Sequence, residues 1–243
     1  MNSDVTLFWH VAAFNHWREV VVEQARYLAR KDFSGKLVVG FVGGAWEDLF
    51  VRKTLDAVGL DYILHCSGSD FNQFEYPTLC LLQSHCNANP AALVGYFHTK
   101  SVSQPNVWHS LMWRWAMNVE VLGCSDMAGS LTNVDVAGYS WTLANELGNQ
   151  HFRGNFWLAR AAYIRRLPDP WVFRDQTWHR HRPAAMPDRF PAEMWIGADA
   201  GVLANDLCTV PGHQPGKDSF ACGHDFWVNH PEHEAHYLKE MLG

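Results

Sequence analysis

Short apolar runs alternate with stretches of helical spacing over the first hundred residues, and this alternation restricts the chain to few folds. The apolar runs cover residues 5–12, 36–42, 62–65 and 92–97, and the second of them is rich in β-branched side chains. Between these runs, apolar side chains recur at the spacing of one buried helix face. Strands that alternate with helices favour parallel pairing, with the helices packed against the sheet. The sequence therefore predicts an α/β fold with a mostly parallel central sheet flanked by helices.

The composition favours a single folded unit and limits the kinds of partner. Hydrophobic residues make up 48% of the 243 positions and charged residues 18%, which is a globular balance. Because no linker or internal repeat divides the chain, we expect one domain over residues 1–243. The formal net charge of −6 argues against a nucleic-acid partner, since phosphate backbones bind clustered Lys and Arg. No apolar run reaches the roughly 18 residues that cross a bilayer, so we expect no membrane span and a cytoplasmic location.

Three polar residues, His98, Thr99 and Lys100, directly follow the fourth apolar run. In a doubly wound sheet the carboxyl ends of the strands face the ligand crevice. A Lys at that edge can neutralise a diphosphate as a compact charge, and a Thr hydroxyl can add a hydrogen bond. A solvated loop is the alternative. The coincidence of a buried strand with three polar side chains favours a binding site.

The segment G-N-F-W over residues 154–157 combines a glycine, an amide and two aromatic rings. Gly154 permits close backbone approach, and Asn155 can hydrogen-bond a polyol. Phe156 and Trp157 offer flat apolar area, which suits the C–H face of an acceptor sugar. A tight glycine turn followed by core aromatic residues explains the same pattern equally well, and the composition of the segment does not separate the two.

A single carboxylate, Glu193, stands in the otherwise apolar segment A-E-M-W over residues 192–195. Burial raises the pKa of a carboxyl group and a nearby cation lowers it, so such a group can be tuned as a general base. A Glu in a salt bridge with an arginine of the same region is the simpler reading.

The order of these motifs resembles a group of small bacterial and viral GT-A-type glycosyltransferases. The resemblance covers most of the chain and rests on seven segments in sequence: W-R-E-V-V-V-E-Q-A-R-Y-L at 17–28, F-E-Y-P-T-L at 74–79, Y-F-H-T-K at 96–100, W-R at 113–114, D-V-A-G at 135–138, G-N-F-W at 154–157 and A-E-M-W at 192–195. Each motif alone is weak, but their shared order is more specific.

The resemblance implies a GT-A-like Rossmann-type fold and a hexosyltransferase-like activity in polysaccharide biosynthesis. The enzyme would move a sugar from a nucleotide-diphosphate donor to a hydroxyl of a glycan acceptor, with inversion and with Glu193 as general base. The implied donor-binding residues are His98, Thr99, Lys100 and Arg114, with Asp70 and Asp135 in reserve for metal or ribose. The implied acceptor-binding residues are Gly154, Asn155, Phe156, Trp157 and Trp195.

The resemblance also bears on cofactors, because the broader GT-A fold carries a metal-binding Asp-x-Asp motif where this chain has His98-Thr99-Lys100. Lys100 would then supply the positive charge, and we assign no metal ligand. A neutral His98 could still bind Mn²⁺ or Mg²⁺.

Two other functions compete with the transferase. The missing Asp-x-Asp and the twelve tryptophans also fit a non-catalytic carbohydrate-binding protein on the same scaffold. A metal hydrolase built on His230, His233 and His236 is a weaker alternative, because the H-E-x-x-H spacing of zincins is absent.

Overall fold

The computed structural model describes residues 5–100, 102, 108–143, 150–181, 190–209 and 231–242. The structural statements below refer to these residues.

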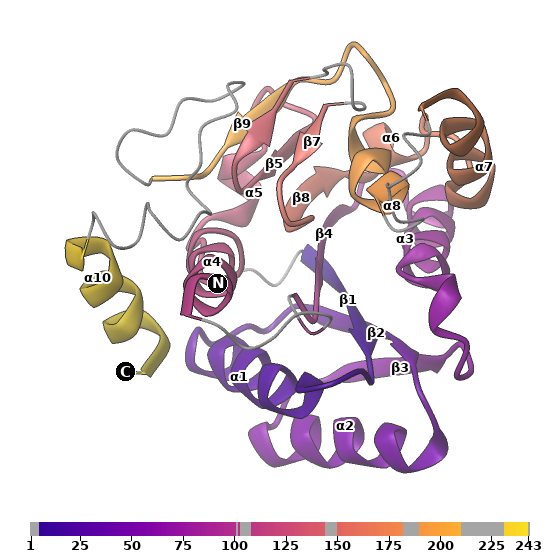
Figure 1. Ribbon diagram of the computed structural model, residues 1–243. Coiled ribbons are helices and arrows are strands. Elements are labelled where there is room, and N and C mark those ends of the chain that lie inside the picture. Colours follow the sequence, from indigo (N-terminus) through magenta and orange to yellow (C-terminus); the bar gives the residue numbers. More distant parts are fainter. Residues whose placement is uncertain are drawn as a thin grey trace.

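The central sheet has seven strands in the order β3-β2-β1-β4-β8-β5-β9 (Figure 1). In this order they are β3 (Tyr62–Cys66), β2 (Lys36–Val42), β1 (Val5–Ala12), β4 (Leu93–His98), β8 (Trp157–Arg160), β5 (Val136–Gly138) and β9 (Ala204–Asp206). Strands β3, β2, β1 and β4 are parallel, whereas β8 is antiparallel to both of its neighbours. The predicted α/β fold with a mostly parallel sheet and flanking helices is confirmed. A separate two-stranded sheet pairs β6 (Trp141–Thr142) with β7 (His151–Phe152).

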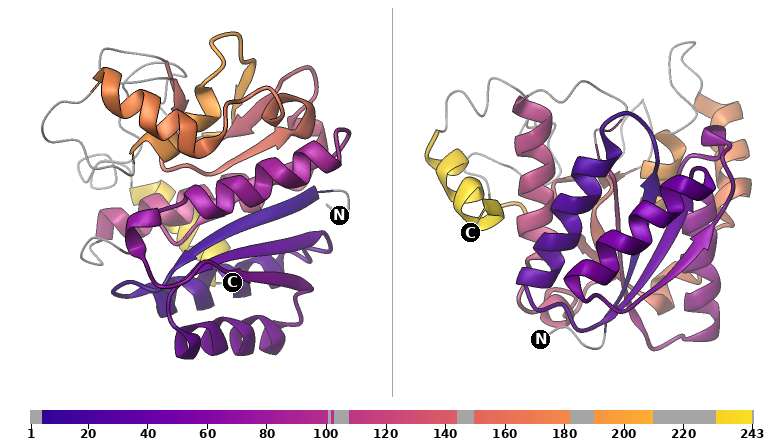
Figure 2. Two further views of the ribbon diagram at one scale, coloured as in Figure 1. Left: turned by 90° about the vertical axis from the view of Figure 1, so that its right-hand side faces the viewer. Right: turned by 90° about the horizontal axis from the view of Figure 1, so that it is seen from below.

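Helices cover both faces of the sheet (Figure 1, Figure 2). One face packs against α1 (Trp17–Arg30), α2 (Ala45–Val58), α4 (Trp108–Met117), the π-helix η2 (Asn118–Leu122), α5 (Met127–Ser130) and α10 (Pro231–Leu242). The other packs against α3 (Tyr76–Ala88), α6 (Ala161–Ile164), α7 (Pro170–His181), α8 (Phe190–Met194) and the 3₁₀ helix η3 (Trp195–Gly197). A second 3₁₀ helix, η1 (Phe71–Gln73), precedes α3.

The two faces hold two separate hydrophobic cores because successive strand side chains point to opposite sides. On β1, Leu7 and Trp9 join the core under α1, while Phe8 between them joins the core under α3. This explains why β1 reads as a nearly continuous apolar run rather than an alternating one.

The sheet register brings the carboxyl ends of β1, β2 and β4 to one edge, since Ala12 pairs with Val42 and His10 pairs with His98. Because β8 runs in the opposite direction, its beginning lies near that edge, and Trp157 pairs with Tyr96. The antiparallel strand therefore brings the turn before Trp157 close to the end of β4.

Candidate functional site

A cavity of about 490 Å³ opens at the carboxyl edge of β1, β2 and β4. Polar side chains from the strand ends and aromatic side chains from the surrounding loops share its wall. The lining residues are His10, Ala12, Phe14, Val42, Phe71, Phe74, Glu75, His98, Thr99, Lys100, Val102, Trp113, Phe190 and Glu193. The structure thus brings four of the predicted residues, His98, Thr99, Lys100 and Glu193, into one cavity.

Lys100 and Glu193 face each other in this cavity although they are 93 positions apart in the sequence. Lys100 follows β4 and Glu193 lies on α8, and their Nζ and Oε1 atoms are 3.6 Å apart. The Lys100 ammonium also lies 4.2 Å from the ring centroid of Trp113. The two charged side chains are only 11% and 15% exposed. Their interaction is therefore less screened by solvent than a surface ion pair.

His98 is held by the turn that precedes β8. Its Nε2 lies 2.9 Å from the carbonyl oxygen of Gly154. A carbonyl oxygen can only accept, so Nε2 carries the hydrogen of this bond. Gly154 has a φ of 85° and Asn155 a φ of 59°, and both values lie in the left-handed region. Glycine adopts this region freely, and Asn more readily than most other residues.

A buried carboxylate, Glu75, connects the same turn to β4. Its Oε2 accepts hydrogen bonds from the hydroxyl of Tyr96 at 2.8 Å and from Nδ2 of Asn155 at 2.6 Å. Asn155 in turn accepts a hydrogen bond of 2.7 Å from the Trp157 indole. Asn155 therefore has a structural partner on each side, and its predicted contact with an acceptor polyol would compete with these bonds.

Glu75 was given no role from the sequence, although it stands in the motif segment F-E-Y-P-T-L at 74–79. It directly precedes α3, where its side chain makes no capping hydrogen bond. Phe74 before it has a φ of 46° and a ψ of −133°, a conformation that costs free energy in a non-glycine residue. A Glu at a helix start, where Ser, Thr, Asp or Asn is usual, was the available signal.

The two histidines of the cavity are held neutral by burial. Burial lowers the pKa of His10 to about 3, with a further contribution from His98. Burial also lowers the pKa of His98, although the nearby Glu75 carboxylate opposes the shift. His10 Nδ1 lies 2.9 Å from the hydroxyl oxygen of Thr78 on α3. Both rings can therefore act as hydrogen-bond partners without carrying a charge at neutral pH.

Arg114, predicted to bind the donor, does not line the cavity. Its guanidinium bonds both carboxylate oxygens of Glu23 on α1, at 2.8 and 3.0 Å, and the side chain is 2% exposed. A third N–H lies 3.4 Å from the carbonyl oxygen of Lys100. Arg114 thus supports the backbone at Lys100, and its charge is compensated by Glu23.

The two reserve candidates, Asp70 and Asp135, lie elsewhere as well. Asp70 is exposed and caps η1 by accepting the backbone N–H of Asn72. Asp135 precedes β5, which runs parallel to β4, so it lies at the amino edge of the sheet. Its carboxylate accepts from the Leu203 backbone and pairs with Arg166 at 3.5 Å. This geometry does not support the predicted donor or metal contacts.

The predicted acceptor aromatics are core residues. Phe156, Trp157 and Trp195 are fully buried, and the Trp195 indole donates to the carbonyl oxygen of Pro168. They leave no exposed ring face for a sugar. The reading of G-N-F-W as a glycine turn with core aromatics fits the structure better. Instead, the rings that line the cavity are Phe14, Phe71, Phe74, Trp113 and Phe190.

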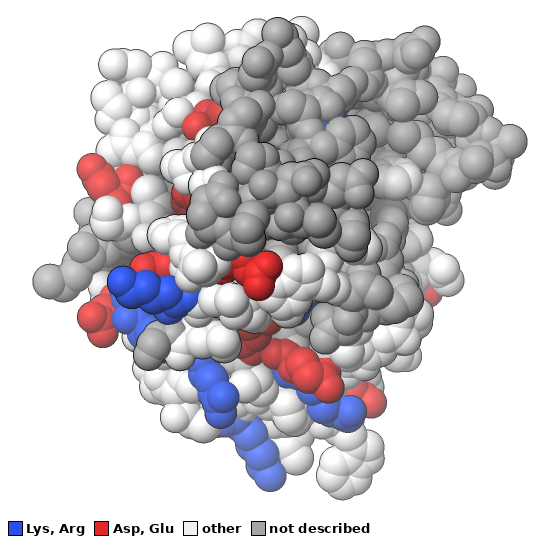
Figure 3. Space-filling model, turned by 60° about the vertical axis from the view of Figure 1, so that its left-hand side comes forward, with Lys and Arg blue, Asp and Glu red and all other residues white. Residues whose placement is uncertain are grey.

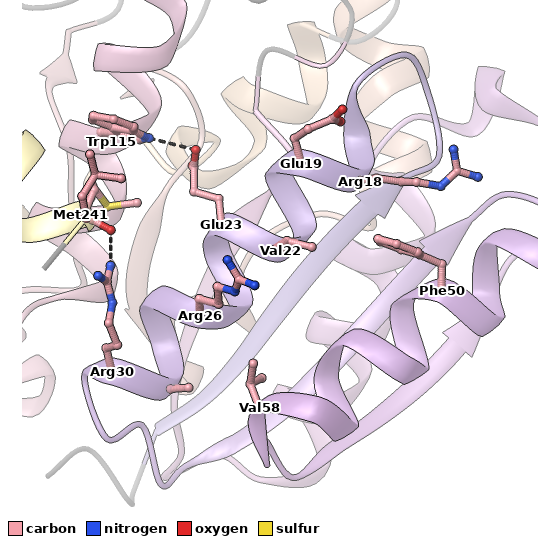
Figure 4. A pocket seen from close by; sticks show the side chains of 12 residues that line it. Arg18, Glu19, Val22, Glu23, Arg26, Arg30, Phe50, Val58, Trp115 and Met241 are labelled. Carbon is pink, nitrogen blue, oxygen red and sulfur yellow. Dashed lines mark hydrogen bonds between the residues drawn. The ribbon is translucent and has the colours of Figure 1, made fainter.

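A larger hollow of about 910 Å³ lies on the outer side of α1, between α2 and α10 (Figure 4). Arg30 there donates to the carbonyl oxygen of Met241, and the Trp115 indole donates to Glu23. Acidic and basic side chains occur side by side on the molecular face shown in Figure 3. No predicted site residue lines this hollow.

The described residues contain neither a metal-binding cluster nor a membrane-spanning helix. No group of three or more His, Cys, Asp or Glu side chains there could hold a metal ion. His230, part of the proposed hydrolase cluster, lies outside the described residues. None of the described helices combines the length and the apolar character that crossing a bilayer requires.

Comparison with known proteins gives a family model and similar solved structures. No match was found among curated proteins. Among solved structures, the chain is similar to a crystal structure of the galactosyltransferase LgtC in complex with donor and acceptor sugar analogs. The sequence identity is 13%, the TM-score is 0.47, and the alignment covers 83% of this chain and 72% of that chain. A family model described as a domain of unknown function (DUF8361) matches residues 8–237, and the chain belongs to this family.

Proposed function

We propose that the protein is an inverting glycosyltransferase that moves a sugar from a nucleotide-diphosphate donor to a hydroxyl of a glycan acceptor. The observation that carries the proposal is the placement of Lys100 and Glu193 3.6 Å apart in one cavity at the carboxyl edge of the sheet. The motif order that resembles GT-A-type glycosyltransferases supports the same activity.

Lys100 and Thr99 form the diphosphate end of the proposed site. The Lys100 ammonium is a compact charge that can stabilise both the bound and the departing diphosphate. The Thr99 hydroxyl oxygen accepts the backbone N–H of Ala12 at 3.2 Å, so its own O–H remains available as a donor.

Glu193 is the proposed general base. Its carboxylate is paired with Lys100. A diphosphate that binds Lys100 draws this cation away from Glu193, and a carboxylate binds a proton more readily when a neighbouring cation is withdrawn. Glu193 then accepts the proton of the acceptor hydroxyl. The oxygen bonds to the anomeric carbon as the bond from that carbon to the diphosphate oxygen breaks, which inverts the configuration.

Aromatic rings form the remaining wall and suit a sugar. Phe14 and Phe71 lie at the exposed part of the cavity, with ring centroids 5.9 Å apart, and are 43% and 40% exposed. Flat apolar rings provide contact area for the C–H faces of sugars or for a nucleobase. These rings take the place of the buried Phe156, Trp157 and Trp195 in the proposed acceptor site.

The proposal is tested by incubating the protein with a panel of UDP- and GDP-sugars and glycan acceptors. We expect release of nucleoside diphosphate, and a product with inverted anomeric configuration by NMR. Calorimetry with UDP and GDP provides the second measurement. Glycan binding without any nucleotide binding would refute the transferase and support a carbohydrate-binding protein on the same scaffold.

A further inference from the structure

Two hydrogen-bond acceptors face each other in the wall of the cavity, apart from Lys100 and Glu193. Oε1 of Glu75 lies 3.6 Å from Nδ1 of His98, and both residues line the cavity. Their side chains are 10% and 11% exposed, so little solvent reaches them.

The other polar atom of each side chain already has protein partners. Oε2 of Glu75 accepts from Tyr96 and Asn155, and Nε2 of His98 donates to Gly154. For Oε1 and Nδ1, the described part of the chain provides no hydrogen-bond or ion-pair partner other than each other. The two atoms are therefore held in a fixed orientation with unused hydrogen-bonding capacity.

The charge state makes both atoms acceptors. The hydrogen on Nε2 leaves Nδ1 of the neutral imidazole with a lone pair. Burial lowers the pKa of His98. The Glu75 and Glu193 carboxylates oppose this shift, and the Lys100 ammonium reinforces it. His10 also faces this ring from β1 and is neutral itself. Two adjacent acceptors without donors are unfavourable in a buried site, so a ligand that brings donors gains affinity there.

We propose that Glu75 Oε1 and His98 Nδ1 together bind a vicinal diol of the substrate, each accepting a hydrogen bond from one of two neighbouring hydroxyls. This inference rests on the proposed transferase function and adds to it the part of the ligand that this pair recognises. A diphosphate presents only acceptors at neutral pH, so the pair repels it and the phosphates are directed to Lys100. The cavity is thereby divided into a cationic part for the diphosphate and an acceptor part for the diol.

The variant Glu75→Gln separates recognition from folding. Its carbonyl oxygen can still accept from Tyr96 and Asn155, which places its NH₂ group toward His98 Nδ1. The buried network is kept, but the amide now occupies the acceptor pair. We expect a melting temperature at least as high as that of the wild type, because the amide removes the contact between two acceptors. We expect a loss of about tenfold to a hundredfold in ligand affinity by calorimetry. Glu19→Gln, an exposed change on α1, is the matched control.

The ligands of the calorimetry identify the source of the diol. If Glu75→Gln loses affinity for UDP-glucose or GDP-mannose but not for UDP or GDP, the diol belongs to the transferred sugar. If it loses affinity for UDP but not for 2′-deoxy-UDP, the diol belongs to the ribose. If it loses affinity only for a glycan acceptor, the diol belongs to that acceptor. Equal affinities of the wild type and Glu75→Gln for all of these ligands would overturn the proposal.

A measurement on the wild-type protein tests the pair even if no nucleotide binds, in which case the transferase proposal fails by itself. In protein labelled with ¹⁵N-histidine, the His98 Nδ1 resonance should have the shift of an unprotonated nitrogen. It should move when methyl glucoside, galactoside or mannoside is added at high concentration. A resonance that shows a protonated Nδ1, or one that no glycoside and no nucleotide sugar moves, would refute the acceptor pair.

Discussion

Arg114 on α4 and Glu23 on α1 form a bidentate ion pair, and Arg114 also donates to the carbonyl oxygen of Lys100. Trp115 and Asn118 add hydrogen bonds to the same carboxylate, at 2.8 and 3.2 Å. The four donors hold α1 against α4 and η2 and support the chain where β4 ends. A cation that the sequence suggested for the donor phosphates thus has a structural role in the protein.

Replacing Arg114 by Met should destabilise the protein, because Glu23 would keep a partly buried charge without its cation. We expect a loss of about 3 kcal/mol in the free energy of unfolding, measured by urea denaturation. The double variant Arg114→Met with Glu23→Gln should lose less than the sum of the two single changes. Additive losses would show that the pair makes no net contribution.

Replacing Lys100 by Met should weaken the binding of UDP or GDP about tenfold to a hundredfold, because a charged hydrogen bond to the diphosphate is lost. Calorimetry at two salt concentrations measures the effect, and the wild type should lose more affinity with salt than the variant. Lys53→Met, an exposed change on α2, is the control. Affinities that are the same for Lys100→Met and Lys53→Met would contradict the assignment of Lys100.

Replacing Glu193 by Gln should slow transfer strongly while leaving donor binding intact. A general base contributes about a hundredfold to ten-thousandfold, so kcat should fall by that factor. The donor Kd by calorimetry should stay within a few-fold of the wild type. Glu47→Gln on α2 serves as the control. If nucleoside diphosphate release continues at the wild-type rate, another group is the base.

Acidification should destabilise the protein in part through His10. Its pKa is about 3 in the folded protein and 6.5 without perturbation, so between these values the unfolded chain binds the proton and the folded chain does not. Stability is therefore lost as the pH falls from about 6.5 toward 3, at about 1.4 kcal/mol per pH unit for this group. The lowered pKa of His98 acts in the same direction.

The variant His10→Gln isolates this contribution, since Gln can still hydrogen-bond Thr78 but does not titrate. Its free energy of unfolding should fall less steeply than that of the wild type between pH 6 and 4. The exposed His65→Gln should follow the wild type. Parallel pH profiles for His10→Gln and the wild type would exclude a titrating His10.

The local pattern of the sequence determined the first four strands and their helices. Their hydrophobic periods depend on neighbours only a few positions apart, so the predicted strands agree with β1 to β4 within one residue. The order of strands and helices also placed His98, Thr99 and Lys100 at the carboxyl edge, because parallel strands all end on the same side. That inference needed no knowledge of long-range contacts.

The tertiary structure decided which side chains meet at that edge. The sequence does not show that β8 is antiparallel, and this direction brings Gly154 and Asn155 to Glu75 and His98. Nor does it show that Glu23, 91 positions before Arg114, compensates that cation. The type of an aromatic or charged residue does not show whether its side chain is buried in the core or lines a cavity. Only the packing of distant segments decides between these two places, because that packing fixes the desolvation of the side chain and its hydrogen-bond partners.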